Sequence, residues 1–318
     1  MSIADEYKTI YQREIESTSN ELICTYSSTV DTHIFQPLSH NCLKACPSGC
    51  SSDCHIKLGE LLRKNLVFYC YGEEEIVQKF NDGNFTNLED AILFAYKNRL
   101  PKRNAKQDGL PGEVLLDLII QTHEPGAYKL AVRTMFRQDD NSEIKGFDLT
   151  YFTFQNNHIS LWLGQAKMGE KGYCKQGIHS DLLKLNSEYL SRQIYFIAEK
   201  QAGITEEGKA ITNAINHINM LTIRESDEKR AESLIKFFSD KHIDIKIPCL
   251  LSYGEGSVYT DIPSINQAIN REIEQVQKYF KTKQYPFNGI VPKILFYVFP
   301  LKDLDRLRGQ GGFYNELC

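Results

Sequence analysis

Four polar residues in the middle of the chain could together bind a divalent metal ion and hydrolyse a phosphodiester. They are Glu113, Asp148, Gln165 and Lys167. Carboxylates such as those of Glu113 and Asp148 are hard oxygen ligands of the kind that Mg²⁺ or Mn²⁺ prefers, and the side-chain carbonyl of Gln165 would add a neutral third ligand. Lys167 would orient the attacking water and offset the charge that develops in the transition state.

The local sequence predicts elements that bring these four residues together. Gln165 and Lys167 end the alternating run HISLWLGQAK, in which side chains two positions apart share one face of a strand. Asp148 lies in the preceding predicted strand, GFDLTYFTF, where a carboxylate among apolar residues is costly without a cation or hydrogen-bond donors. Glu113 follows Gly112 at the start of the predicted helix GEVLLDLIIQTH. We therefore expect two acids, an amide and a lysine to converge at one edge of a sheet.

The rest of the pattern from Gly112 onward predicts a mixed α/β domain. A strand is expected at YKLAVRTMFR, and one long amphipathic segment at 178–189 precedes further helices near 211–218 and 234–238. The runs IDIKIPCLLSY and VPKILFYVF are typical of buried strands, and SINQAINREIEQVQKYF between them is typical of a helix. The order of helix, three strands, helices, strand, helix and strand indicates a central mixed sheet flanked by helices.

A polar, turn-rich connection, PKRNAKQDGLPG, begins at Pro101 and predicts a soft domain boundary. Residues 1–106 would form an N-terminal, cysteine-containing α+β extension, and residues 107–318 the α/β domain that carries the four polar residues. Within the extension, a helix is expected to begin near Asn87 and to end before Pro101.

The arrangement of these motifs resembles a known group of enzymes. A glutamate on a helix, then an aspartate and a (E/Q)-x-K pair across a hairpin, then a helix and a further strand, resembles the PD-(D/E)xK nuclease superfamily with its restriction-endonuclease-like fold. More narrowly, GEVLLDLII, GFD and LWLGQAKMG resemble the HamA family, the nuclease subunits of the Hachiman anti-phage defence system. This resemblance covers roughly residues 110–300. It implies a magnesium-dependent deoxyribonuclease that acts on DNA and is held with a superfamily 2 helicase, HamB.

Gln165 stands where that motif usually has a glutamate, so the site has one negative charge fewer. Two functions from different classes therefore stay open. The chain is either an active Mg²⁺-dependent deoxyribonuclease or a catalytically inactive, nuclease-like scaffold that docks the helicase.

The chain contains nine cysteines and no export signal, which favours reduced thiols or a metal site over a disulfide framework. Four of them recur every four residues and could hold zinc: Cys42, Cys46, Cys50 and Cys54. Their spacing differs from the paired C-x₂-C units of common zinc ribbons, and Pro47 and Gly49 interrupt a regular helix. Buried or free thiols are therefore the favoured interpretation, with zinc as the alternative.

The formal net charge of -4 excludes a global positive field that would draw the chain onto a polyanion, so contact with nucleic acid requires a local patch or a partner. One basic run precedes the α/β segment: Lys97, Arg99, Lys102, Arg103 and Lys106. A solvated helix end is the favoured interpretation of this run, and phosphate contact is the alternative.

The two ends of the chain suggest neither targeting nor phosphate binding. The first residues lack a signal-peptide pattern and no apolar run is long enough to span a bilayer, so we expect a soluble, cytoplasmic protein. The C-terminal motif RGQGGF at 308–313 predicts a flexible turn, because it lacks the preceding strand and following helix of a phosphate loop.

Overall fold

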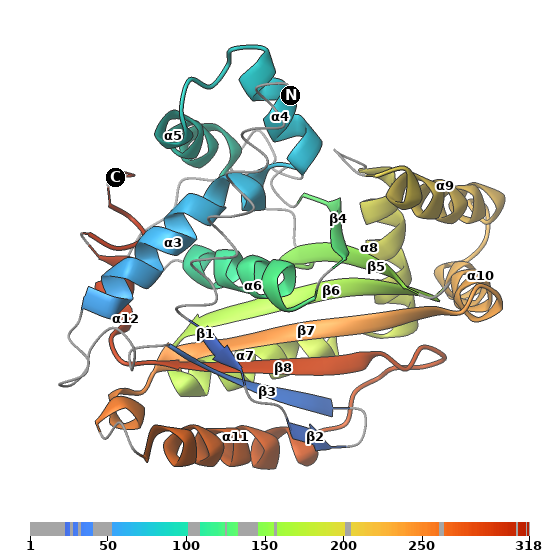
Figure 1. Ribbon diagram of the computed structural model, residues 1–318. Helices are drawn as coiled ribbons and strands as arrows, with labels where there is room; N and C mark the ends of the chain where they lie inside the picture. Colours follow the sequence, from blue (N-terminus) through green and yellow to red (C-terminus); the bar gives the residue numbers. More distant parts are fainter. Residues whose placement is uncertain are drawn as a thin grey trace.

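The structure, a computed structural model, shows an α/β fold in which helices cover both faces of a mixed β-sheet (Figure 1). It describes residues 23–25, 28–30, 33–40, 53–100, 109–124, 126–132, 146–155, 158–200, 205–260, 264–309, 311–315 and 317. The expected fold class, a central mixed sheet flanked by helices, is confirmed. Of the helices in these ranges, none has both the length and the apolar character needed to cross a membrane.

The N-terminal part contributes strands followed by helices. In the described ranges these are β1 (Ile23–Thr25), β2 (Ser28–Val30), β3 (His33–His40), α3 (Asp53–Cys70), α4 (Glu73–Asn81) and α5 (Leu88–Arg99). The helix expected near Asn87 is α5, and the Asn87 side chain caps it by accepting a hydrogen bond from the Asp90 amide. Helix α5 ends before Pro101, as predicted.

From residue 109 onward the elements follow the predicted order. They are α6 (Leu110–His123), β4 (Ala127–Ala131), β5 (Leu149–Gln155), β6 (His158–Gly169), α7 (Lys171–Leu183), α8 (Ser187–Glu199), α9 (Glu206–Leu221), α10 (Asp227–Asp240), β7 (Ile243–Gly254), the 3₁₀ helix η2 (Gly256–Tyr259), α11 (Ile265–Lys281), β8 (Lys293–Leu301) and α12 (Leu304–Arg308). The strand expected at 128–137 is seen as β4, and residues 133–145 lie outside the described ranges.

The amphipathic segment at 178–189, expected as one continuous element, is two helices. Helix α7 ends at Leu183, and α8 begins at Ser187. The side chain of Asn186 accepts a hydrogen bond from the Tyr189 amide and so caps α8. An asparagine at this position favours a new helix start, because its side-chain oxygen satisfies an amide that has no partner within the helix. The helical spacing of apolar residues continues across the break between α7 and α8, so the sequence pattern did not reveal the break.

The sheet has the strand order β1-β3-β8-β7-β6-β5-β4, and β2 pairs with β3 outside this path. Strands β3, β8, β7 and β6 are parallel neighbours, whereas β4, β5 and β6 form an antiparallel meander. The N-terminal strand β3 therefore belongs to the same sheet, next to β8 (Figure 1).

Alternate residues of the central strands face two separate hydrophobic clusters. On β8, Leu295, Tyr297 and Phe299 pack with α3 and α6, whereas Phe296 and Val298 pack on the opposite face with α7 and α11. Parallel strands covered by helices on both faces read as continuous apolar runs, which is the pattern seen in VPKILFYVF. The two faces thus carry different helices that approach the same strands.

The expected domain boundary near residue 106 falls in the segment 101–108, outside the described ranges. Elements from both sides of it share one core, because Leu62 and Leu66 of α3 lie in the same cluster as Leu115 and Ile119 of α6. The division of the chain at this point stays a prediction. In the structure, α3 covers α6 and so encloses one side of the region that carries the predicted site.

The described residues of the C-terminal motif RGQGGF form a turn that packs against the rest of the fold, and Gln310 lies outside the described ranges. Leu307 before the motif and Phe313 at its end are fully buried. The Phe313 amide donates to the Leu307 carbonyl at 2.8 Å, and the Gly312 amide donates to the Gly309 carbonyl at 3.0 Å. A β-carbon on Gly59 of α3 would lie 2.6 Å from the Leu307 oxygen, so α3 packs directly against this turn.

Helix α6 approaches strand β6 very closely. A β-carbon on Gly112 would lie 2.8 Å from the β-carbon of Met168, and one on Gly164 would lie 2.6 Å from the Leu149 side chain. At Gly112 glycine is required by the close approach of α6 to β6, and at Gly164 it leaves room for the Leu149 side chain. The contact places the first turn of α6, with Glu113, over the end of β6.

We predict that Gly112→Ala lowers the free energy of unfolding by about 1–3 kcal/mol, because the added methyl must displace α6 from β6 in a packed region. Gly172→Ala is the matched control, since it also lies in the first turn of a helix next to β6 but a β-carbon there would meet nothing within 4 Å. Urea denaturation of both variants measures the difference. Equal midpoints for the two would contradict the close contact.

Candidate active site

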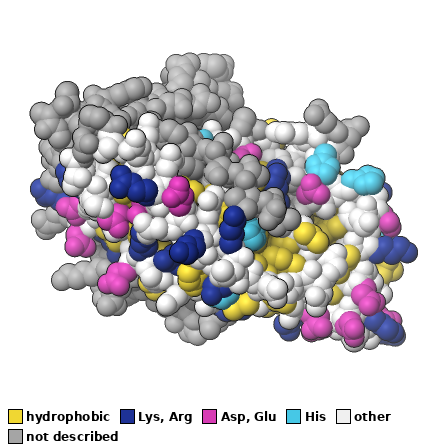
Figure 2. Space-filling model, turned by 90° about the horizontal axis from the view of Figure 1, so that it is seen from below, with side chains coloured by type: hydrophobic (Ala, Val, Ile, Leu, Met, Phe, Trp, Pro, Cys, Tyr) yellow, Lys and Arg dark blue, Asp and Glu magenta, His cyan; other side chains and the backbone are white. Residues whose placement is uncertain are grey.

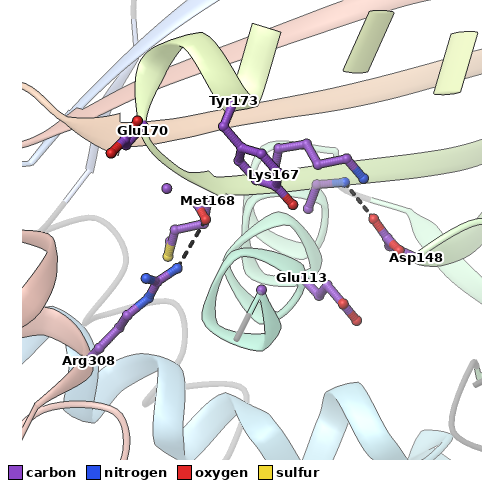
Figure 3. Close-up of a pocket in the computed structure, with 10 residues that line it drawn as sticks. Glu113, Asp148, Lys167, Met168, Glu170, Tyr173 and Arg308 are labelled. Carbon is purple, nitrogen blue, oxygen red and sulfur yellow. Dashed lines mark hydrogen bonds between the residues drawn. The ribbon is translucent and has the colours of Figure 1, made fainter. Parts of the chain in front are cut away.

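A pocket of about 520 Å³ lies at the carboxyl end of β6 (Figure 3). It is lined by Gly109, Glu113, Asp148, Ala166, Lys167, Met168, Gly169, Glu170, Tyr173 and Arg308. Three of the four residues predicted from the sequence, Glu113, Asp148 and Lys167, therefore border one cavity.

Asp148 is held against β6 by its main chain and its side chain. Its amide donates to the Gly164 carbonyl at 2.8 Å, and its carboxylate accepts a hydrogen bond from the Ala166 amide at 2.7 Å. The second of these bonds is the dashed line beside Asp148 in Figure 3. The side chain is buried, so the amide donor partly offsets the cost of removing a carboxylate from water.

Glu113 reaches the pocket from the other face of the sheet, because it lies in the first turn of α6. Its carboxylate is buried and accepts a hydrogen bond from the hydroxyl of Tyr69 on α3. The positive end of a helix dipole favours a negative charge in the first turn. Helix α3, from the N-terminal part of the chain, thus contributes directly to the surroundings of a predicted site residue.

Lys167 extends from β6 across α7 and forms an ion pair with Asp181, with 2.7 Å between Nζ and Oδ2. Room for its stem is left by Gly177, where a β-carbon would lie 2.9 Å from Cε of Lys167. Burial alone would lower the pKa of Lys167, but the carboxylates of Asp148 and Asp181 outweigh it and raise that pKa above its ordinary value. Lys167 is therefore a fixed ammonium ion at neutral pH rather than a general base.

Asp181 is held in its charged form by the same contacts. Burial would raise the pKa of this carboxyl, but hydrogen bonds from Lys167 and Lys184 outweigh burial and hold the pKa below its ordinary value. The sequence alone did not point to Asp181. The one signal in the sequence was the spacing of Gly177 and Asp181. They are four residues apart and so share one face of α7, the face along which the stem of Lys167 lies.

Gln165 shares its strand face with Lys167, as predicted, but it is not among the residues that line the pocket. It is buried, and its side-chain nitrogen donates to the carbonyl of Gly146 at 3.2 Å. An amide whose nitrogen is engaged in this way presents its oxygen as the remaining acceptor. The structure therefore gives Gln165 a defined contact beside Asp148.

Asp117, one helical turn after Glu113, is a second buried acid on α6. Its carboxylate accepts from the Tyr151 hydroxyl at 2.6 Å and from the Gln121 side chain at 2.6 Å, and it lies 2.9 Å from the Lys129 ammonium. These partners neutralise and saturate the carboxylate, which ties α6 to β4 and β5. Asp117 therefore has a structural role, and Glu113 is the acid of α6 that faces the pocket.

The donor groups around the pocket suit a hard cation of the magnesium type. Mg²⁺ is commonly held by one or two carboxylates and otherwise by water and substrate phosphates, and Glu113 and Asp148 supply two. Within the part of the chain that the structure describes, no group of three or more His, Cys, Asp or Glu side chains could hold a metal by itself. A cation here would depend on water and substrate for its other ligands.

The zinc site predicted at the cysteine series stays a prediction. Cys42, Cys46 and Cys50 lie outside the described ranges. Cys54, on α3, is buried in a small cluster with Val258 and Ile269.

The structure describes two residues of the basic run at 97–106, Lys97 and Arg99. Arg99 forms an ion pair with Glu75 and lies over the ring of Tyr71, 4.5 Å from its centroid. Lys97 is exposed at the end of α5, and the remaining basic residues lie outside the described ranges. Arg99 is thus half-buried and paired within the fold, unlike the solvated helix end that was the favoured interpretation.

A mixed sheet with two buried carboxylates and a lysine around one pocket at a strand end is an α/β fold consistent with a nuclease-like protein. The model of the HamA family matches residues 19–317, nearly the full chain. The chain therefore belongs to the HamA family and is a component of the Hachiman anti-phage defence system. The match extends well into the N-terminal region, which the resemblance seen in the sequence did not include. No curated protein sequence matches the chain.

We predict that Asp181→Asn lowers the pKa of Lys167, because burial then acts on the ammonium with one carboxylate fewer to oppose it. An NMR titration of the lysine ¹³Cε signals, assigned with Lys167→Met, measures the change. Asp227→Asn is the matched control, since Asp227 lies in a half-exposed ion pair with Arg192 on a different pair of helices. An unchanged Lys167 titration in Asp181→Asn would show that the ion pair does not hold the lysine.

Proposed function

We propose that this chain is a metal-dependent nuclease that hydrolyses DNA phosphodiesters and acts with the helicase subunit of the Hachiman system. The observation that carries the proposal is the convergence of Glu113, Asp148 and Lys167 on one pocket. Two anionic oxygen donors and a fixed cation are the groups that phosphodiester hydrolysis requires.

Each residue would have a separate role. Glu113 and Asp148 would hold Mg²⁺ or Mn²⁺, and the side-chain oxygen of Gln165 would be a neutral third ligand. The bound ion would supply Lewis acidity and neutralise developing negative charge. Lys167, kept protonated between Asp148 and Asp181, would orient the attacking water and offset charge on the phosphate.

A partner is proposed because the chain offers little general attraction for nucleic acid. Its formal net charge is -4, and on the face shown in Figure 2 Lys and Arg side chains lie among Asp and Glu side chains. Affinity for a nucleic acid rests largely on the phosphates that a protein neutralises, so this chain alone would bind weakly. A helicase that holds the DNA would bring the strand to the pocket, and membership of a defence system supports such a partner.

We predict that plasmid DNA is cleaved in the presence of Mg²⁺, that chelation stops cleavage, and that Asp148→Ala abolishes it by removing a carboxylate ligand. Lys167→Met should lower the rate roughly 10²–10³-fold, as expected for loss of one preorganised charged group. The assay uses the chain alone and the chain with its helicase. Lys229→Met, at an exposed position on α10, is the control for loss of a lysine.

Two outcomes would contradict the nuclease proposal. Cleavage by Asp148→Ala at the wild-type rate would place the active site elsewhere. If the wild-type complex neither cleaves nucleic acid nor binds Mg²⁺ in calorimetric titrations, the chain is instead the inactive, nuclease-like scaffold that docks the helicase.

We further predict that Gln165→Glu lowers the Mg²⁺ concentration needed for half-maximal cleavage, because a carboxylate is a stronger ligand than an amide of the same shape. The variant also loses the hydrogen bond to the Gly146 carbonyl, so its free energy of unfolding without metal should fall by about 1 kcal/mol or more. Metal titrations of cleavage and urea denaturation separate the two effects. Loss of stability without any gain in metal affinity would show that Gln165 serves only to hold Gly146.

A further inference from the structure

Arg308 joins the pocket from a part of the chain that the proposed mechanism does not use. It is the last residue of α12, and its guanidinium donates from Nη2 to the Met168 carbonyl on β6 at 3.0 Å. Figure 3 shows it reaching the end of β6 from the side opposite Asp148. The residue thus connects the C-terminal turn to the strand that carries Lys167.

Two residues near Arg308 in the C-terminal turn anchor the described part of that turn in the core. Leu307 and Phe313, on either side of Arg308, are fully buried. A β-carbon on Gly312 would lie 2.2 Å from the Leu307 oxygen, so this glycine is required for the chain to fold back so tightly. A long side chain on a packed turn is positioned at lower entropic cost than one on a free loop.

Among the described residues, a carboxylate balances the charge of Lys167, but none is paired with Arg308. Lys167 pairs with Asp181, whereas Arg308 takes part in none of the ion pairs found among the described residues. Its Nε is buried and has no hydrogen-bond partner in that part of the chain. A half-buried guanidinium without a carboxylate partner is costly unless an anion approaches its terminal nitrogens.

Among the anions that could enter this pocket, a phosphate diester fits best. Guanidinium groups bind phosphate through two parallel hydrogen bonds, and one donor of Arg308 already fixes its plane against β6. Asp148 and Glu113 lie across the pocket from Arg308 (Figure 3), and Glu170 also lines it, so these carboxylates would repel an anion that is not shared with a cation. A phosphate would therefore be held at the Arg308 side, next to the position of the scissile group.

We propose that Arg308 is a substrate-binding residue that holds a phosphate of the nucleic-acid strand beside the scissile one, and so sets the strand's register in the pocket. This inference rests on the proposed nuclease function. It assigns a role to the RGQGGF motif, whose packed turn presents the arginine.

The test measures binding rather than cleavage. A fluorescein-labelled single strand of DNA and the matching duplex are titrated with the full chain in Ca²⁺, which replaces Mg²⁺, at several salt concentrations, and fluorescence anisotropy gives Kd. Arg308→Gln should raise Kd roughly tenfold or more. It should also reduce the slope of log K against log salt by about 0.7–0.9, the change expected when one phosphate contact is lost.

Two further variants separate a phosphate contact from other effects. Arg306→Gln removes the same charge from the same helix at an exposed position outside the pocket, so Kd and slope should stay near those of the wild type. Arg308→Lys keeps the charge and loses the planar fork, so it should keep the salt slope but raise Kd. If circular dichroism shows that Arg308→Gln does not fold, Arg308→Lys becomes the variant that tests the phosphate contact.

A wild-type Kd and slope in Arg308→Gln would overturn the inference, and so would equal weakening by Arg306→Gln. A wild-type Kd in a folded Arg308→Lys would overturn the role of the guanidinium fork. These results leave the nuclease proposal standing, because Mg²⁺-dependent cleavage tests that separately. If the wild type, with its helicase present, binds neither the single strand nor the duplex and cleaves no DNA, the proposed function fails and the inference fails with it.

Discussion

The close approach of α6 to the end of β6 is the constraint on which the site depends. Gly112 lets the helix lie against the β-carbon of Met168, and Gly164 lets β6 lie against Leu149 of β5. With these contacts, a carboxylate from one face of the sheet and two side chains from the other reach the same pocket. A larger residue at position 112 would have to move α6, and with it Glu113, away from β6.

Electrostatic balance follows from that geometry. Asp148 and Glu113 are buried, and each accepts a hydrogen bond from a neutral donor, the Ala166 amide and the Tyr69 hydroxyl. Lys167 is the nearby cation, but Asp181 shares its charge. Burial would lower the pKa of Lys167, but the carboxylates of Asp148 and Asp181 outweigh burial and raise that pKa. Asp117 differs, because it pairs with a separate lysine, Lys129, and does not line the pocket.

The fold was predicted well wherever local periodicity decides the element. The strands around Asp148 and Gln165, helix α6 and the later β-α-β order all follow from apolar spacing, because side-chain direction repeats every two residues in a strand and about every 3.6 in a helix. The prediction of one continuous segment at 178–189 was wrong, since the cap at Asn186 interrupts an unbroken apolar pattern. Helix α3 and strand β3 were also missed as parts of the core, because their partners are about 50 to 260 residues away in the sequence.

From the sequence alone we predicted that Glu113, Asp148, Gln165 and Lys167 converge, and which elements carry them; three of the four border one pocket. Tertiary structure alone decided which groups complete their surroundings. Tyr69 and Arg308 come from helices far from β6 in the sequence, and Asp181 reaches Lys167 only through the packing of α7 against β6. The reason is that periodicity gives only the direction of a side chain within its own helix or strand. Ion pairs and hydrogen bonds across the pocket depend on how separate elements pack together.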